Sequence, residues 1–489
     1  MRKKQSPNVV IIYADDLGFG DVGCYGASDI HTPNIDRLAS RGVSFNHGYA
    51  TAATCTPSRY SLLTGSYPWR NPQASILAGD SSSIIPSDMP TIARMFQKAG
   101  HRTAVVGKWH LGLGKDDIDW NRPISSTPND VGFDESFIMA ATNDRVPCVY
   151  VENRKVFGLT DDDPIEVTYD WEKAFPGEPT GRTNPELLRL DYSHGHDATI
   201  INGVSRIGHM RGGKAALWDD ESMAETFLER ALDFINVNSK TPFFLYYALH
   251  QPHVPRLPSK TFKGSTKLGA RGDVIAELDW CVGQITDNIE RLGLTEDTII
   301  VFTSDNGPVL NDGYKDQAEE LNGQHNPAGN LRGGKYSMFD GGTRVPFIVS
   351  WPGRINSGIS DAIICQVDLY ACFASIINQV LNAEEAPDSL PIVSTFLGEN
   401  EIGRTDLVLE GTKAKTVLRR NNWVYIPPYE GRSINENTNI ELGNSLEAQL
   451  YDLRLDAGQQ KNIVSERPDI VKIMSSRLNE ILSGERTRY

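Results

Sequence analysis

Short runs of consecutive apolar residues recur along much of the chain. They do not alternate with polar residues, and this is the pattern of strands that are buried on both faces of a parallel sheet. The runs comprise residues 8–13, 103–107, 242–249, 298–304 and 347–353. A shorter strand is expected at residues 43–45. The pattern predicts a central sheet that is covered on both faces.

Segments with helical spacing lie between these runs. In residues 220–235, apolar side chains at positions 223, 227, 231 and 234 fall on one stripe, as in an amphipathic helix. Further helices are expected at residues 32–39, 89–96 and 274–292. The alternation of strands and helices favours an α/β fold, with a large mixed sheet sandwiched by helices.

The pattern changes after about residue 382. Short strands are expected at residues 407–409, 415–419, 423–426 and 449–454, and a helix at residues 468–482. We therefore divide the chain into a larger domain, residues 1–382, and a smaller C-terminal α+β domain with an antiparallel sheet, residues 383–489. Within the larger domain, residues 116–213 are loop-rich, and such insertions at the rim of a site commonly select the substrate.

Composition narrows the function. The 489 residues carry a net charge of −15, which argues against a nucleic-acid partner, since such a partner favours a basic face. Six cysteines are scattered without a Cys-x-x-Cys pair, so they do not predict a zinc site, although one or two disulfides are possible. An anionic ligand would need a locally basic pocket.

Two pairs of oxygen-bearing side chains follow predicted strands. Asp15 and Asp16 come after the first apolar run, and Asp305 and Asn306 come after residues 298–304. Ligands of open α/β sheets bind at the carboxyl ends of strands, and hard oxygen ligands favour Ca²⁺ or Mg²⁺. Either pair alone could form a solvated turn, but the two pairs together predict one metal site.

A thiol stands at an expected helix start. Residues 55–65 read Cys-Thr-Pro-Ser-Arg-Tyr-Ser-Leu-Leu-Thr-Gly. Pro57 suits the first helical turn, and Gly65 suits the end of the helix. Cys55 would lie at the positive end of the helix dipole with Arg59 one turn away, where an anion or a group that attacks one is stabilised. The alternative is a buried structural cysteine beside a helix cap.

Two more strand exits carry cationic or imidazole groups. Lys108 and His110 follow the second apolar run and would project the same way from an extended segment. They suit an anion and a proton acceptor. His253, held between prolines after residues 242–249, suits a general acid, and His250 is its nearby alternative.

The segment around Cys55 resembles the type I sulfatase signature, Cys-x-Pro-Ser-Arg-x-x-x-Leu-Thr-Gly, at every fixed position. The segments after the other strands resemble further motifs of that family, in the family's order. The resemblance spans nearly the whole chain. It implies an alkaline-phosphatase-like fold and a sulfuric ester hydrolase in which the cysteine is oxidised to formylglycine by a formylglycine-generating or anaerobic sulfatase-maturing enzyme.

The resemblance also implies roles for the candidate residues. Asp15, Asp16, Asp305 and Asn306 would hold Ca²⁺, with Mg²⁺ the less expected ion. With Arg59, that ion would activate one hydroxyl of the hydrated formylglycine at position 55 for attack on sulfur. Lys108 and Lys335 would bind the sulfate oxygens. His253 would act as the acid that protonates the departing sugar hydroxyl, and His110 would act as the base that removes the proton of the second hydroxyl.

The substrate expectation is a sulfated carbohydrate, with a galactose or N-acetylgalactosamine unit favoured. Polar clusters of the 116–213 insertion are nominated for sugar contacts: Asn143, Asp144, Arg145, His194 and His196, with His250 added from the strand exit. The two insertion histidines could also form a second metal site. The alternative functions are a phosphonate or phosphate monoester hydrolase, or a calcium-dependent glycan binder if Cys55 is unmodified.

The start of the chain bears on localisation. Residues 1–7 are basic and lead directly into the first predicted strand, with no visible signal peptide or membrane span. Because similar enzymes that attack extracellular glycans are exported, we expect a periplasmic or extracellular protein whose leader is absent from this chain. A cytoplasmic location is the alternative.

Overall fold

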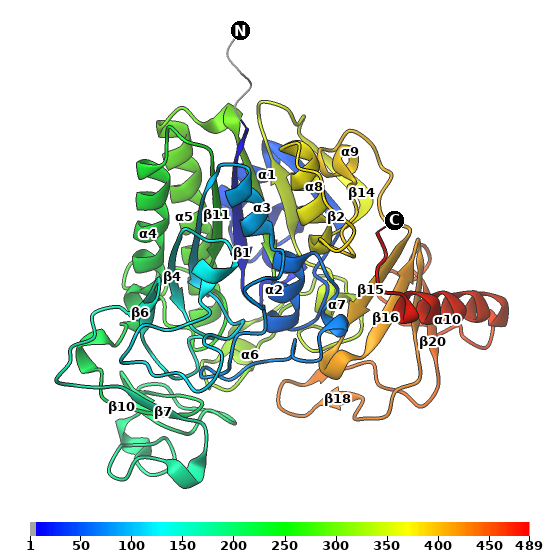
Figure 1. The fold of residues 1–489 in the computed structure, drawn as a ribbon. Helices are drawn as coiled ribbons and strands as arrows, with labels where there is room; N and C mark the ends of the chain where they lie inside the picture. Colours follow the sequence, from blue (N-terminus) through cyan, green and yellow to red (C-terminus); the bar gives the residue numbers. More distant parts are fainter. Residues whose placement is uncertain (1–5, 489) are drawn as a thin grey trace.

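The computed structural model describes residues 6–488, so the basic residues 1–5 considered above lie outside the described part. Ten strands form one sheet in the order β14-β2-β13-β12-β1-β11-β3-β4-β5-β6 (Figure 1). Their bounds are β1 Asn8–Ala14, β2 Gly42–Tyr49, β3 Arg102–Lys108, β4 Glu135–Met139, β5 Tyr150–Glu152, β6 Lys155–Val156, β11 Phe243–Ala248, β12 Thr298–Ser304, β13 Phe347–Ser350 and β14 Gly358–Cys365.

The centre of this sheet is parallel. Strands β12, β1, β11, β3 and β4 run in one direction, whereas β13 is antiparallel to both of its neighbours. Every residue of β1 is buried, as its continuous apolar sequence predicts. The expectation of a mixed α/β sheet is therefore confirmed.

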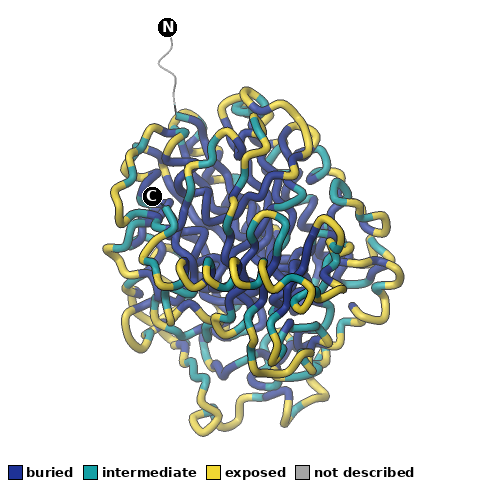
Figure 2. Tube along the Cα trace, turned by 90° about the vertical axis from the view of Figure 1, so that its right-hand side faces the viewer, coloured by how far each residue is buried: buried dark blue, intermediate teal, exposed yellow. Residues whose placement is uncertain are grey.

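Helices cover both faces of the sheet (Figure 1). One group contains α1 Pro33–Ser40, α4 Met223–Val237 and α5 Gly269–Arg291, which contact one another. The other contains α2 Cys55–Thr64, α3 Ile92–Lys98, α8 Leu369–Ile376 and α9 Val393–Phe396. The buried interior extends through both layers, and exposed residues are concentrated at the outside (Figure 2). Among the described residues, no helix is both long and apolar enough to cross a membrane.

A four-stranded antiparallel sheet lies beside the main sheet. Its order is β15-β16-β17-β20, and α10 Pro468–Ser483 packs on β16 and β17. The strand bounds are β15 Asp406–Glu410, β16 Thr416–Arg420, β17 Trp423–Ile426 and β20 Gln449–Asp452. This sheet has its own apolar cluster, which also takes in Tyr49 and Tyr67 of the larger part. The strands and helix agree with the sequence-based expectation for this region.

Two regions differ from the sequence-based pattern. Residues 347–353 were expected to hold the last strand of the main sheet, but β14 follows and pairs with β2 at the edge. The 116–213 insertion contains β4, β5 and β6, which extend the main sheet, whereas residues 116–134 and the later part, after β6, are loop-rich. That later part carries two small antiparallel sheets: β7 Glu166–Thr168 pairs with β10 His209–Arg211, and β8 Ile200–Ile201 forms a hairpin with β9 Val204–Ser205.

Three short elements complete the edge at which the parallel strands end. They are α6 Ala318–Leu321, α7 Asp340–Thr343 and the hairpin of β18 Ile434–Asn435 with β19 Ile440–Glu441. In Figure 1 this edge faces downwards, between the small β7–β10 sheet and the β18 hairpin. The loops that follow β1, β3, β11 and β12 all open onto it.

Candidate active site

The helix α2 begins at Cys55 and ends at Gly65, whose φ of 64° lies in the left-handed region. Both ends agree with the prediction made from Pro57 and Gly65. All ten residues of α2 are buried, and the Cys55 side chain is 2% exposed. Burial raises the pKa of the Cys55 thiol, although Lys108 and Lys335 oppose this. An unmodified thiol at this position is therefore held in its neutral, weakly nucleophilic form.

The two pairs of strand-end oxygens meet because β1 and β12 are parallel neighbours. The Asp16 backbone N–H donates to Asp305 Oδ1 (3.1 Å), and Asn306 Nδ2 donates to Asp16 Oδ1 (2.8 Å). Asp15, Asp16, Asp305 and Asn306 are all fully or almost fully buried. The tertiary structure thus brings together the four residues that the sequence nominated for the metal.

Three buried cationic side chains face the three carboxylates. Arg59 donates to Asp305 Oδ2 from Nε (3.1 Å) and Nη2 (2.6 Å). Lys108 Nζ donates to Asp15 Oδ2 (2.6 Å), and Lys335 Nζ donates to Asp16 Oδ2 (2.8 Å). The charges of these six groups cancel, and Asp312, which also pairs with Lys335, adds one negative charge. A bound divalent cation would therefore leave the cluster positive and suited to an anionic ester.

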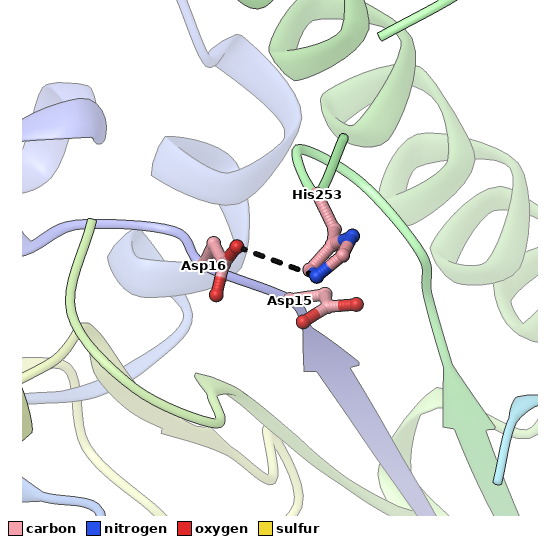
Figure 3. Close-up of side chains that lie close together, drawn as sticks. All are labelled: Asp15, Asp16 and His253. Carbon is pink, nitrogen blue, oxygen red and sulfur yellow. Dashed lines mark ion pairs between the residues drawn. The ribbon is translucent and has the colours of Figure 1, made fainter. Parts of the chain in front are cut away.

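The donor set fits a hard divalent cation. Asp15 Oδ1 and Asn306 Oδ1 are buried and accept no hydrogen bond. Burial, reinforced by Asp305, raises the pKa of Asp15 well above its ordinary value, so its ionised form needs a nearby cation. Ligand atoms of Asp15, Asp16 and His253 lie within 4.8 Å of one another, and these side chains point towards one another from the loops after β1 and β11 (Figure 3). Oxygen ligands of this kind suit Ca²⁺ or Mg²⁺.

His253 is held in a defined orientation. Its Nδ1 lies 2.7 Å from the Val254 carbonyl oxygen and 3.2 Å from Asn143 Oδ1, so Nδ1 carries the proton that these acceptors need. Its Nε2 then faces Asp16 Oδ2 at 3.9 Å (Figure 3). Burial, together with Lys335 and Lys108, holds the pKa of His253 well below its ordinary value. The negative charge of a sulfate ester would oppose this shift.

The arrangement of Lys108 and His110 differs from the expected one. Strand β3 ends at Lys108, and His110 has a φ of 52°, so the two side chains do not belong to one extended segment. His110 Nε2 lies 3.0 Å from the Leu77 carbonyl oxygen, and its Nδ1 is buried without a partner. Burial and Lys108 hold the pKa of His110 well below its ordinary value. The ring is therefore neutral, and with its proton on Nε2 the lone pair of Nδ1 is free.

A cavity of about 240 Å³ opens above Cys55, and residues from distant parts of the chain line it. Lys335 and His253 are joined there by four of the nominated insertion residues: Asp144, Arg145, His194 and His196. The other two nominated residues, Asn143 and His250, do not line this cavity. Asn143 instead contacts His253 and donates to the Pro255 carbonyl oxygen (3.2 Å), and His250 is buried away from the cavity, near the Phe227 ring.

Asp144 organises this wall of the cavity. Its Oδ1 accepts from Arg145 Nη1 (2.8 Å), and its Oδ2 lies 2.9 Å from His196 Nε2. Burial alone would raise the pKa of Asp144, but Arg145 and His196 hold it well below its ordinary value. Because His196 Nδ1 also contacts the His194 carbonyl oxygen (2.8 Å), both of its ring nitrogens are engaged within the protein. These contacts do not favour a second metal site at His194 and His196.

Several residues that line the cavity were not predicted from the sequence. Asp312 accepts from Lys335 Nζ (2.7 Å) and from the hydroxyl of Tyr336 (3.0 Å). The polar loop between β18 and β19 adds Asn435, Asn437 and Thr438. The Asn-Asp-Gly turn at residues 311–313 and the asparagine-rich run at 435–439 were the available signals. Neither signal follows a predicted strand or lies in the 116–213 insertion, where most of the other candidates were found.

Comparison with known proteins supplies the family. The model of the sulfatase family matches residues 7–378. Over 489 residues the chain is 47% identical to an N-acetylgalactosamine-6-O-sulfatase of Bacteroides thetaiotaomicron, matching 100% of this chain and 94% of that protein. It is 31% identical over 427 residues to the N-acetylgalactosamine-6-sulfatase of Rattus norvegicus, with 84% of this chain and 70% of that protein covered.

A solved structure agrees with these matches. It is named for the metabolism of multiple glycosaminoglycans by Bacteroides thetaiotaomicron. It superimposes on this chain with a TM-score of 0.96 at 46% sequence identity. The alignment covers 98% of this chain and 99% of that chain. The similarity therefore extends through the C-terminal sheet as well as the main sheet.

Proposed function

The chain belongs to the sulfatase family, and from that premise we propose that its substrate is a saccharide with a 6-O-sulfated N-acetylgalactosamine unit. The hydrolysis of a carbohydrate sulfate ester is established by the family and by the relative at 47% identity. The sugar and the position of its sulfate are the proposed part. Both named relatives described above carry N-acetylgalactosamine 6-sulfatase names.

One observation favours a sugar sulfate as the substrate over a simple aryl sulfate. The cavity above Cys55 is lined not only by Lys335 and His253 but also by the charged pair of Asp144 and Arg145. Sites for sugars use such fixed donors and acceptors, since each sugar hydroxyl both donates and accepts hydrogen bonds. The proposed sugar would direct its sulfate towards Cys55 and its ring hydroxyls towards Asp144, Arg145 and His196.

The chemistry divides among groups of this chain. In the sulfatase family a formylglycine at the signature cysteine provides a hydroxyl nucleophile, and Ca²⁺ supplies Lewis-acid stabilisation of that hydroxyl and of the sulfate. We assign Cys55 as the modified residue and Asp15, Asp16, Asp305 and Asn306 as the metal ligands. Arg59 holds Asp305 in place through its two hydrogen bonds.

The remaining groups bind charge and move protons. Lys108 and Lys335 are placed to balance charge on the sulfate oxygens. His253 would give a proton from Nε2 to the departing sugar hydroxyl, because an alcohol leaves poorly as an alkoxide. Nδ1 of His110, buried and without a partner, would accept the proton that must leave before sulfate is released.

Replacement of His253 by alanine should reduce turnover of the sugar sulfate by about 10²–10⁴-fold, because general-acid help to the leaving group is lost. Aryl sulfates with acidic phenols need little such help and should lose much less. Steady-state kinetics on a series of aryl sulfates would measure this dependence on the leaving group. An equal loss on every substrate would contradict the proton-donor role.

Replacement of Arg145 or His196 by alanine should damage turnover of the sugar sulfate far more than turnover of a small aryl sulfate. Each change removes a hydrogen-bonding partner of Asp144 in the cavity wall, and we expect a loss of about 10–100-fold in kcat/KM on the sugar. Arg182→Ala is the matched control, since Arg182 also pairs with an aspartate of the insertion but is 56% exposed. Equal losses on both substrates would remove these residues from the specificity pocket.

The proposed function is tested with the protein co-expressed with a formylglycine-generating or anaerobic sulfatase-maturing enzyme and supplied with Ca²⁺. Defined monosaccharides sulfated at O4 or O6, in the galactose and N-acetylgalactosamine series, would be compared with an aryl sulfate and an aryl phosphonate. We expect the N-acetylgalactosamine 6-sulfate to have the highest kcat/KM. A preference for O4 sulfate would refute the proposed position, and a large preference for phosphonate would refute the sugar sulfate altogether.

A further inference from the structure

A second cavity, of about 580 Å³, adjoins the one above Cys55. The two cavities share Ile76 and Tyr336 as lining residues, so they are neighbours across one wall. Thr54 and Pro57, on either side of Cys55 in the sequence, also line the second cavity. Its volume lies within the range of about 300–1,000 Å³ that is typical of small-molecule sites.

The lining is largely apolar but contains two buried polar atoms without partners. Prolines and the rings of Trp69 and Tyr336 supply apolar surface. The indole Nε1 of Trp69 and the carboxyl Oε2 of Glu410 are both buried and make no hydrogen bond. Unpaired buried polar atoms are costly, so a donor and an acceptor beside one cavity point to a ligand that satisfies both.

Glu410 is fixed firmly at this position. Glu410 is the last residue of β15 and is only 3% exposed. Its backbone N–H donates to the Thr51 carbonyl oxygen (2.9 Å), and its carbonyl oxygen accepts from the Ala53 N–H (2.8 Å). The C-terminal sheet thereby places a carboxyl group beside the segment that leads into Cys55. Burial raises the pKa of Glu410 to about 8, so a neutral carboxylic acid that does not repel an anionic saccharide is favoured at neutral pH.

We propose that this second cavity is a subsite for the pyranose unit that is glycosidically linked to the sulfated sugar. The proposal rests on the proposed function, because it requires the sulfated sugar to occupy the cavity above Cys55. A pyranose ring has an apolar face for Trp69 and the prolines, and hydroxyl groups that can pair with the indole N–H and with Glu410. Lys413 lines the rim and is exposed, which adds a cation for an acidic neighbouring sugar.

The subsite predicts a preference for longer substrates. Matured wild-type protein should turn over a disaccharide that carries the 6-sulfated unit with a kcat/KM about tenfold higher than the corresponding monosaccharide, since a second sugar adds binding contacts. Ser75, which is exposed and lines the second cavity but not the first, offers a way to fill it. In Ser75→Trp this preference should disappear while the monosaccharide is turned over within about twofold of the wild-type rate.

Gln73→Trp is the matched control, because Gln73 is exposed on the same loop but lines neither cavity. Glu410→Gln provides a second measurement and should reduce kcat/KM for the disaccharide more than for the monosaccharide. The subsite is refuted if wild-type protein shows no preference for the disaccharide. It is also refuted if Ser75→Trp leaves that preference intact, or if it lowers kcat/KM equally for the disaccharide and the monosaccharide. Turnover of the monosaccharide 6-sulfate by wild-type protein tests the proposed function separately, so the two failures can be told apart.

Discussion

Replacement of Cys55 by alanine should abolish sulfate ester hydrolysis, with a loss of about 10⁴-fold or more in kcat, since the residue that would become the nucleophile is removed. The side chain is small, and none of the six cysteines forms a disulfide. Stability should therefore fall by only about 1 kcal/mol. Kinetics on a sugar sulfate and on an aryl sulfate, with denaturant unfolding, would measure both effects.

The same prediction can be tested without a mutation. Protein made with and without a maturing enzyme should differ in the mass of the peptide that contains residue 55, as expected for conversion of a thiol to an aldehyde. Activity should follow the converted fraction. Full activity in protein whose Cys55 is entirely unmodified would contradict the assignment, since burial keeps this thiol neutral.

Replacement of Arg59 by alanine should destabilise the protein by about 3–5 kcal/mol, as expected when one partner of a buried ion pair is removed. Arg59 and Asp305 are both 0% exposed and are joined by two hydrogen bonds. Arg59 Nη2 also lies 3.7 Å from Asp15 Oδ1, so Asp305 loses its paired cation and Asp15 keeps only Lys108. Denaturant unfolding would give the free energy, and activity should fall with it.

Arg432→Ala is the matched control for Arg59. Arg432 pairs with Glu436 at the surface, where the two side chains are 71% and 67% exposed. Its removal should change the free energy of unfolding by less than about 1 kcal/mol. Arg59→Lys keeps the charge but not the planar geometry of the guanidinium, and we expect an intermediate loss. Similar losses for Arg59→Ala and Arg432→Ala would show that burial of the pair contributes nothing.

Local signals in the sequence predicted much of the central fold. The strands β1, β3, β11 and β12 are continuous apolar runs that only a sheet covered on both faces can bury. Since parallel strands end at one edge, the polar residues after each run were expected to meet, and Asp15, Lys108, His253 and Asp305 do lie around Cys55. The chemical roles of these residues follow from the family resemblance and stay predictions until they are measured.

Other features depend on contacts between segments that are far apart in the chain. The edge strand β14 has exposed residues at its start and lacks the continuous apolar run of a central strand, so its pairing with β2 could not be read locally. His110 was expected to project with Lys108, but its left-handed backbone turns it towards Leu77. A backbone conformation of this kind is set by the surrounding packing and leaves no pattern in the sequence.

By itself, then, the sequence determined the central strands, the helix that begins at Cys55 and the set of groups available for chemistry, because each depends on neighbours along the chain. Only the tertiary structure decided how those groups pair. It gave Lys335 a second carboxylate in Asp312, put Asp144 between Arg145 and His196, and brought Glu410 of β15 to a cavity beside Cys55. Apart from the adjacent Asp144 and Arg145, these residues lie far apart in the sequence, and they meet only because of the way the two sheets and the insertion pack together.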